Sequence, residues 1–308
     1  MSKGLYPFGL NHYRSLKFQK LRKLLSKNQR KIKVEGAYGS SLSFLLIDIF
    51  SSINQQIFYI SNSKETASYV YSDIVELIGE INCSFLPSNY RSDAKKIKDE
   101  SNIINRSKTI RDILDKETKI IVTYPEAIFE KIPNEKEIDS KTINVEKGQF
   151  LKINSINELL FDLKFEKDDY VQQPGDFAKR GNIVDIFSFA YTSPLRIEFD
   201  GDKVESIREF NIDTQYSTKE LVEAKIIPDF SNESLIKRAN SIVELLESNT
   251  TLLVEEIDSI KKQLSKNFME NKNEYSDRLF LKEIDERKII QLNNFNKDFD
   301  IKLDIVQQ

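Results

Sequence analysis

The sequence predicts an α/β protein with two kinds of sheet, a parallel sheet flanked by helices and a smaller antiparallel sheet. Short apolar strands alternate with helical stretches at the beginning and again near the end of the chain, which is the order that produces parallel sheets. Between them, residues 165–217 alternate apolar and polar side chains between turn-forming Gly and Pro residues, a pattern typical of antiparallel strands. At 308 residues the chain is long enough for two or three domains with separate cores.

The composition excludes several classes of function. Hydrophobic residues make up 39% and charged residues 31%, as in a globular protein. The net charge is -3, so nucleic-acid binding would have to be local. The single cysteine, Cys83, excludes an internal disulfide and a cysteine zinc site, and the single histidine, His12, excludes histidine triads. No apolar run approaches the roughly 20 residues that cross a bilayer, so we expect a cytoplasmic protein without a membrane partner.

The first predicted element is an amphipathic helix between Leu10 and Gln29. Leucines recur at helical spacing among lysines and arginines, so one face is apolar and the other is basic. The basic face is compatible with nucleic-acid binding. A simple solvated face is the plainer interpretation, because the cations lack interleaved exposed aromatic residues.

A strand at Lys31–Glu35, a glycine turn and a helix over 44–53 then follow in the order of a phosphate-binding loop. Leu42 stands where such a loop carries its phosphate-binding lysine, and this exchange removes a charge-assisted contact of about 1.5–3 kcal/mol. We therefore interpret the segment as a degenerate nucleotide loop, formed by Gly36, Gly39, Ser40, Ser41, Leu42 and Ser43. The alternative is that the helix N-terminus still binds an anion weakly.

Strand and helix continue to alternate beyond the loop. No Asp-Glu pair that would hold magnesium follows the apolar strand at 119–123, so we expect no cofactor in this chain. Later elements are predicted as a helix at 154–163, a helix at 231–248, a strand at 251–255 and a strand at 299–306. Because no closing element follows the last strand, we expect the chain to be part of a longer protein.

The antiparallel region carries the most informative side chains. Lys167, Arg180 and Arg196 stand beside apolar strand residues, and Asp200-Gly201-Asp202 predicts a tight hairpin turn. No nucleophile with a neighbouring base and no metal-ligand cluster occurs in this stretch. The three cations therefore indicate a docking surface for an acidic partner, or cations that merely solvate a sheet edge.

This region also resembles a known family. The run Pro174–Gly181 (PGDFAKRG), followed by 183–187 (IVDIF) and 196–208 (RIEFDGDKVESIR), resembles the UvrB-homology region at the N-terminus of bacterial transcription-repair coupling factors. The tail 210–217 (FNIDTQYS) favours the coupling factor over UvrB. The resemblance implies a UvrB-like arrangement of a degenerate RecA-like (P-loop-type) domain over 1–137, a UvrA-binding α+β domain over 138–228 and a partial α/β domain over 229–308 that packs on the first.

The resemblance also implies a function. The chain would recruit UvrA to stalled transcription complexes in nucleotide excision repair, with contact residues Lys167, Arg180, Arg196 and Phe199, and would have no ATPase of its own. Lys167 departs from the arginine of the family pattern, and Asp200 departs from a second phenylalanine. The full-length protein would be a monomeric ATP-dependent DNA translocase with RNA polymerase and double-stranded DNA as partners. The alternatives are a UvrB-like nucleotide-dependent repair enzyme and an autoinhibitory platform within the same full-length protein.

Overall fold

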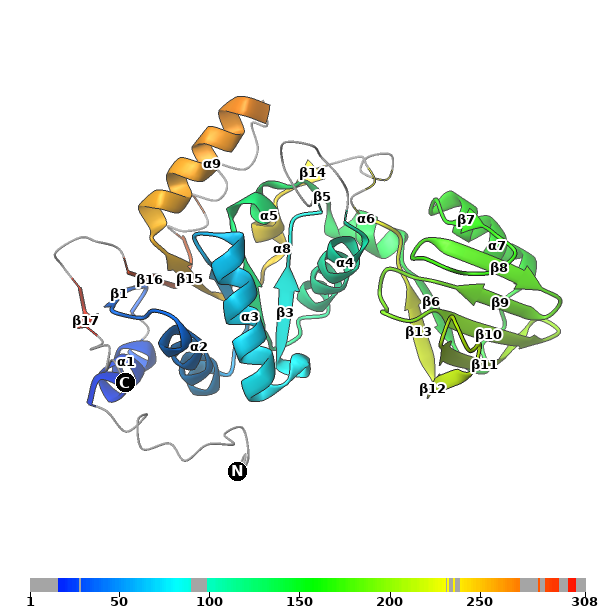
Figure 1. Ribbon diagram of the computed structural model, residues 1–308, viewed down its shortest axis with the longest axis horizontal. Coiled ribbons are helices and arrows are strands. Elements are labelled where there is room, and N and C mark those ends of the chain that lie inside the picture. The colour runs from blue at the N-terminus through cyan, green and yellow to red at the C-terminus, as the bar shows by residue number, and fades with distance from the viewer. Residues whose placement is uncertain are drawn as a thin grey trace. The chain divides into compact units, whose positions relative to one another are not determined.

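The chain folds into two compact units (Figure 1). The computed structural model describes residues 16–27, 29–89, 99–230, 232, 235, 239–271, 282, 286–293 and 299–302. The first unit comprises 1–88, 112–131 and 241–308, and the second comprises 89–111 and 132–240. His12, the beginning of the predicted N-terminal helix and the end of the predicted last strand lie outside the described residues.

The first unit is built on a seven-stranded parallel sheet, in the order β17-β1-β16-β15-β2-β4-β3. The prediction of an α/β fold with a parallel sheet is therefore confirmed. Its central strands are buried on both faces, as their continuous apolar runs predict. The strands are β1 (Lys31–Glu35), β2 (Ile57–Ile60), β3 (Cys83–Leu86), β4 (Ile120–Thr123), β15 (Thr251–Glu255), β16 (Ile289–Leu292) and β17 (Ile301–Lys302).

Helices cover this sheet. One apolar cluster joins side chains of α1, α2 and α3 to the strands, and α2 and α3 lie side by side in Figure 1. Helix α3 is capped at its N-terminus by Ser63, whose hydroxyl accepts a hydrogen bond from the Thr66 amide at 3.2 Å, and at its C-terminus by Gly79 with φ 83°. The helices are α1 (Leu16–Ser26), α2 (Ser40–Ile53), α3 (Lys64–Ile78), α5 (Pro125–Phe129), α8 (Ile242–Leu245), α9 (Ile257–Asn271) and the short 3₁₀ helix η2 (Glu80–Asn82).

The second unit holds a six-stranded sheet in the order β12-β11-β10-β9-β8-β7. All its pairs are antiparallel except β7 with β8. Its strands are β7 (Glu166–Lys167), β8 (Asp176–Arg180), β9 (Ile183–Ile186), β10 (Leu195–Asp200), β11 (Lys203–Phe210) and β12 (Ser217–Leu221). The second unit also contains two small antiparallel pairs, β6 (Ile143–Glu146) with β13 (Glu223–Ile226) and β5 (Ile132–Pro133) with β14 (Ala239–Asn240). Its helices are α6 (Glu135–Ser140) and α7 (Ile153–Asp162). Helix α4 (Glu100–Leu114) contains residues of both units.

The six-stranded sheet has one apolar face and one largely polar face. Phe177, Ile186 and Leu195 face each other across β8, β9 and β10, and each is fully buried. On the next register position, Ala178, Asp185 and Arg196 are aligned on the opposite face. The predicted alternation and the hairpin turn, with Gly201 at φ 60°, are confirmed.

The last part of the chain differs from the prediction. Strands β15, β16 and β17 fall within 229–308 and lie in the same sheet as β1 and β2, whereas β14, in the same range, pairs with β5. The boundaries at 137 and 228 stay a prediction. The prediction of one helix over 231–248 was wrong, because described residues of this range form β14 and the four-residue α8. Helix α8 starts at a capping box of Ser241 and Glu244.

The described residues lack two features of other classes of protein. No helix within the described ranges is both long and apolar enough to cross a membrane. Among the same residues, no three His, Cys, Asp or Glu side chains are grouped as metal ligands would be.

Candidate protein-interaction site and the degenerate loop

The polar face of the six-stranded sheet is organised by a buried carboxylate, Asp185 of β9, which is 1% exposed. Arg196 of β10 donates from Nε to Asp185 Oδ1 at 2.7 Å and from Nη2 to Oδ2 at 2.9 Å. Arg180 of β8 donates from Nη2 to the same Oδ2 atom. A single carboxylate therefore holds two guanidinium groups from the strands on either side of it, and the cluster carries a net charge of one cation.

Arg196 is the more enclosed of the two arginines. Its side chain is 15% exposed, its Nη2 also donates to Gln215 Oε1 at 2.8 Å, and its guanidinium lies 4.3 Å from the ring centroid of Phe210. The hydrogen bonds that Arg196 donates to Asp185 are the main cause that raises the Arg196 pKa above its ordinary value. Arg196 is thus held by Asp185, Gln215 and Phe210, and its main role on the polar face is structural.

Arg180 is the more accessible arginine. Its side chain is 37% exposed, and its guanidinium lies 5.1 Å from the ring centroid of Tyr170, which is itself 59% exposed. A guanidinium held by one carboxylate and one ring keeps its orientation while its outer N–H groups face solvent. Arg180 is therefore the side chain of this cluster that can meet an acidic partner directly.

A second ion pair continues the polar face towards the next strand. Arg208 of β11 lies opposite Arg196 and pairs with Glu198 of β10, with Nη2 and Oε1 2.6 Å apart. Ser206 donates to the other oxygen of Glu198 at 2.8 Å. Each arginine has its own carboxylate, so like charges that face each other across β10 and β11 are compensated.

The four predicted contact residues do not form one cluster. Arg180 and Arg196 meet at Asp185, whereas Lys167 is exposed on the two-residue strand β7 and lies opposite Phe177, a residue of the apolar face. Phe199 is 3% exposed, so its ring packs within the domain. In this conformation Phe199 can support the contact surface only by packing under it. Direct contact of Phe199 with UvrA stays a prediction.

The degenerate loop between β1 and α2 is closed by the protein itself. The side-chain oxygen of Asn293, which follows β16, accepts hydrogen bonds from the amides of Gly36 at 3.0 Å and Ala37 at 3.1 Å. The Asn293 side-chain amide donates in turn to the Ala37 carbonyl, and Asn293 is fully buried. In a working phosphate-binding loop the backbone amides point at phosphate oxygens. Here two of them are already satisfied by a side chain.

The remaining loop residues are also engaged. The Tyr38 amide donates to the Ser41 hydroxyl at 3.0 Å, and Leu42 is 1% exposed within the main core. The buried Ser43 hydroxyl donates to Asp73 Oδ2 of α3 at 3.0 Å. A working loop would have its phosphate-binding lysine at position 42 and its magnesium-binding Ser or Thr at position 43. Here position 42 is a core leucine, and the Ser43 hydroxyl is hydrogen-bonded to α3. Gly39, with φ 54°, and the exposed Ser40 complete the turn into α2.

Glu255 lies at the same carboxyl edge of the sheet, at the end of β15. It accepts hydrogen bonds from the hydroxyls of Tyr59 and Ser61, both at 3.1 Å, and from the Asn62 amide at 3.4 Å. Burial is the main cause that raises its pKa, and these hydrogen bonds partly oppose the shift. The carboxylate is 5% exposed and is occupied by protein donors.

Sequence reasoning missed Asp185, Asn293 and Glu255. A signal existed for Asp185, because an acid in the centre of an apolar strand requires a cationic partner, and arginines flank it on two neighbouring strands. Glu255 could have been found as the first of two acids after an apolar strand. Asn293 had no local signal, because it meets the loop across more than 250 residues of chain.

Comparison with known proteins now adds to this geometry. Residues 143–231 match the family described as UvrB interaction domain. The chain is 27% identical over 194 residues to the transcription-repair-coupling factor of Bacillus subtilis, which covers 63% of this chain and 16% of that protein. It is 31% identical over 178 residues to the transcription-repair-coupling factor of Borreliella burgdorferi, covering 56% of this chain and 15% of that protein.

UvrABC system proteins B are similar as well. The protein of Carboxydothermus hydrogenoformans is 25% identical over 230 residues, which covers 69% of this chain and 35% of that protein. The resemblance predicted from the sequence is therefore confirmed: the chain carries a match to the UvrB interaction domain and has transcription-repair-coupling factors and UvrABC system proteins B as homologues. The chain spans about a sixth of the length of the coupling factors and about a third of the UvrB protein.

Proposed function

We propose that this chain acts in nucleotide excision repair by binding UvrA through the polar face of its six-stranded sheet, and that it performs no ATP-driven step itself. The observation that carries the proposal is the pair of arginines fixed on the buried Asp185 carboxylate. Both arginines and Asp185 fall within 143–231, the segment that matches the UvrB interaction domain.

A fixed arginine suits recognition of an acidic protein surface. Guanidinium groups bind carboxylates with two parallel hydrogen bonds, and a side chain that is already ordered loses less entropy when it binds. Arg180 offers such a group, with Tyr170 beside it as an exposed aromatic ring. Arginine and tyrosine are, with tryptophan, enriched among the residues that contribute most to the binding energy of protein interfaces. We expect Arg180 to be the centre of the contact. Lys167 is in register with Phe177 of the apolar face, so from the edge strand β7 it would add only a weaker charge at the rim.

The state of the nucleotide loop favours a binding module over an enzyme. Restoring a nucleotide site would require breaking the Asn293 bonds to the Gly36 and Ala37 amides and placing a cation at the buried position of Leu42. We therefore propose that the parallel-sheet unit is a degenerate RecA-like domain that provides a scaffold.

The wider role rests on the homologues. We propose that the chain belongs to a transcription-repair coupling system, in which UvrA is recruited to stalled transcription complexes. RNA polymerase, double-stranded DNA and an ATP-dependent translocase activity would belong to other regions of such a protein.

Binding of the chain to immobilised UvrA, measured by surface plasmon resonance, tests the proposal. Arg180→Ala removes the accessible guanidinium and should weaken binding by about 30-fold, the equivalent of a 2 kcal/mol contact. Arg180→Lys keeps the charge but not the bidentate geometry and should give an intermediate loss. Lys64→Ala, on α3 of the first unit, is the control and should bind like the parent.

Two results would contradict the proposal. The first is equal affinity of the parent and Arg180→Ala for UvrA. The second is ATP hydrolysis by the chain that disappears on a change in the loop, which would support the UvrB-like enzyme instead. A melting curve for each variant establishes that lost binding does not reflect unfolding.

A further inference from the structure

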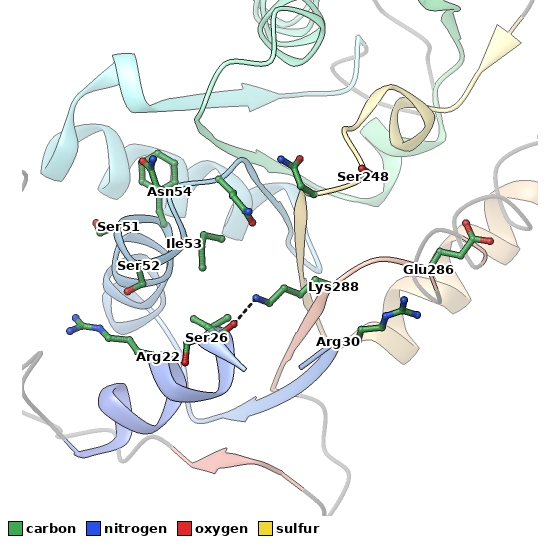
Figure 2. Close-up of a pocket in the computed structure, with 14 residues that line it drawn as sticks. Arg22, Ser26, Arg30, Ser51, Ser52, Ile53, Asn54, Ser248, Glu286 and Lys288 are labelled. Carbon is green, nitrogen blue, oxygen red and sulfur yellow. Dashed lines mark hydrogen bonds between the residues drawn. The ribbon is translucent and has the colours of Figure 1, made fainter. Parts of the chain in front are cut away.

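The first unit contains a cavity of about 1130 Å³ at the amino edge of its parallel sheet (Figure 2). Two of its cations are engaged by the protein itself: Arg22 pairs with Asp48, and Lys288 Nζ donates to the Leu25 carbonyl at 3.2 Å. Phe50, the aromatic residue among its described lining, is 6% exposed. The polar face of the six-stranded sheet differs, because it combines a held guanidinium with exposed tyrosine rings.

Two loops of the second unit meet on this polar face. Residues 168–175 join β7 to β8, and residues 211–216 join β11 to β12. Val171 of the first loop and Ile212 of the second pack in one small apolar cluster, which includes Ala178 of β8. Because Ala178 lies on the polar face of the sheet, the two loops meet beside the arginine cluster.

The first of these loops is held by a buried carboxylate at the start of β8. Asp176 Oδ2 accepts hydrogen bonds from the backbone amides of Gln172 and Gln173, both at 3.0 Å. Such bonds fix the path of the chain through the loop. Tyr170 lies in this loop, is 59% exposed, and has its ring centroid 5.1 Å from the Arg180 guanidinium. Its ring therefore stands beside the accessible arginine on an ordered backbone.

The second loop is held by Arg196. Its Nη2 donates to Gln215 Oε1 at 2.8 Å and its Nη1 to the Gln215 carbonyl at 3.4 Å. Gln215 Nε2 donates in turn to the Ile212 carbonyl at 2.8 Å. The Gln215 amide donates to the Asn211 carbonyl at 2.8 Å, and the Asn211 amide donates to the Tyr216 carbonyl at 3.0 Å. The loop is thus closed on itself, and Arg196 fixes it through Gln215.

Tyr216 ends this second loop and presents its side chain to solvent. The side chain is 77% exposed, although the Tyr216 carbonyl is bonded across the loop. A tyrosine ring supplies a large contact area at a low cost in conformational entropy, and a fixed backbone lowers that cost further. Tyr170 and Tyr216 are therefore two exposed rings on ordered loops beside the arginine cluster.

We infer that Tyr170 and Tyr216 are contact residues for the acidic partner and that Gln215 positions Tyr216. The inference rests on the proposed function, so the partner is UvrA. The matching surface would carry a carboxylate for Arg180 beside apolar groups that the two rings cover, and a tyrosine hydroxyl can donate to the same acidic groups. Arg196 would serve the contact chiefly by holding Gln215.

Binding of the 308-residue chain and its variants to immobilised UvrA, measured by surface plasmon resonance, tests the contact. Tyr216→Ala and Tyr170→Ala should each weaken binding roughly tenfold, as the loss of an aromatic contact residue does. Tyr216→Phe keeps the ring and should bind within about twofold of the parent. Tyr69→Ala is the matched control, because Tyr69 of α3 in the first unit is also 77% exposed, and it should bind like the parent.

A double-mutant cycle tests the positioning role. Gln215 has φ 60°, a conformation open to glycine, so Gln215→Gly removes the side-chain bonds without straining the backbone. The change should weaken UvrA binding about threefold in the parent. In the Tyr216→Ala background it should weaken binding by less than about 1.5-fold, because its effect passes through Tyr216. A melting curve for each variant establishes that it is folded.

The outcomes separate this inference from the proposed function. Parent-like binding by Tyr216→Ala, with weakened binding by Arg180→Ala, would overturn the inference and leave UvrA binding in place. A loss in Tyr69→Ala as large as that in Tyr216→Ala would overturn it too, since any exposed ring would then matter equally. Fully additive losses in the double variant would contradict the role of Gln215. No binding by the folded parent would overturn the proposed function and the inference together.

Discussion

Replacing Asp185 with Asn is the change that the structure predicts most sharply. Asn has the same shape but no charge, and its NH₂ group would face guanidinium donors in place of an acceptor oxygen. Asp185 receives two hydrogen bonds from Arg196, at 2.7 and 2.9 Å, and one from Arg180. Breaking a buried ion pair on one side costs about 3–5 kcal/mol, because the other charge stays buried without compensation.

The lower end of that range applies here. The Arg180 side chain is 37% exposed and can turn to solvent, whereas Arg196, at 15%, cannot do so without leaving Phe210 and Gln215. We therefore expect Asp185→Asn to lower the free energy of unfolding by about 3 kcal/mol, which corresponds to a melting temperature roughly 10 °C lower.

Urea unfolding followed by far-UV circular dichroism measures this effect, since the chain contains no tryptophan. Glu205→Gln is the matched control, because it removes one exposed carboxylate from β11 of the same sheet and should change stability by less than about 0.5 kcal/mol. If Asp185→Asn unfolds at the same urea concentration as this control, the carboxylate does not organise the face as described.

The other predictions concern the first unit. Asn293→Ala leaves the buried amides of Gly36 and Ala37 without their acceptor and should lower the free energy of unfolding by about 2–4 kcal/mol in urea; a change below about 0.5 kcal/mol would contradict the closed loop. Burial raises the pKa of Glu255 above its ordinary 4.5, so the folded state holds this proton more tightly and stability should be lost as pH rises through the raised value. Glu255→Gln should flatten that dependence, and an unchanged slope above pH 4.5 would argue against it. Burial also raises the pKa of the Cys83 thiol, so an aromatic disulfide reagent should react only as fast as the protein unfolds; rapid labelling of the native protein would refute this.

Much of the fold could be predicted from local patterns. The alternation over 183–187 and 195–200 predicted that successive side chains of β9 and β10 point to opposite faces of an antiparallel sheet, because a strand places successive residues on opposite faces. Apolar runs identified β4 and β15 as buried strands. These features depend on neighbours within a few residues, which is the information that a single sequence provides.

What could not be predicted depends on distant partners. The helix expected over 231–248 failed, because apolar spacing there reflects burial of α8 and its neighbours and not one continuous helix. Phe199 stays a predicted contact residue, but its place on the apolar side of the β10 alternation is also what a core residue requires, and its side chain is 3% exposed. The role of Asn293 follows only from the pairing of β16 with β1, far apart in sequence.

The most direct test of the account is calorimetric titration of the 308-residue chain with purified UvrA, beside the Arg180→Ala variant. We predict saturable binding by the parent, and a loss of the binding signal in the variant while its melting curve shows that it is folded. Absence of binding by the folded parent, or equal binding by both proteins, would contradict the claim that the arginines held by Asp185 form the UvrA contact.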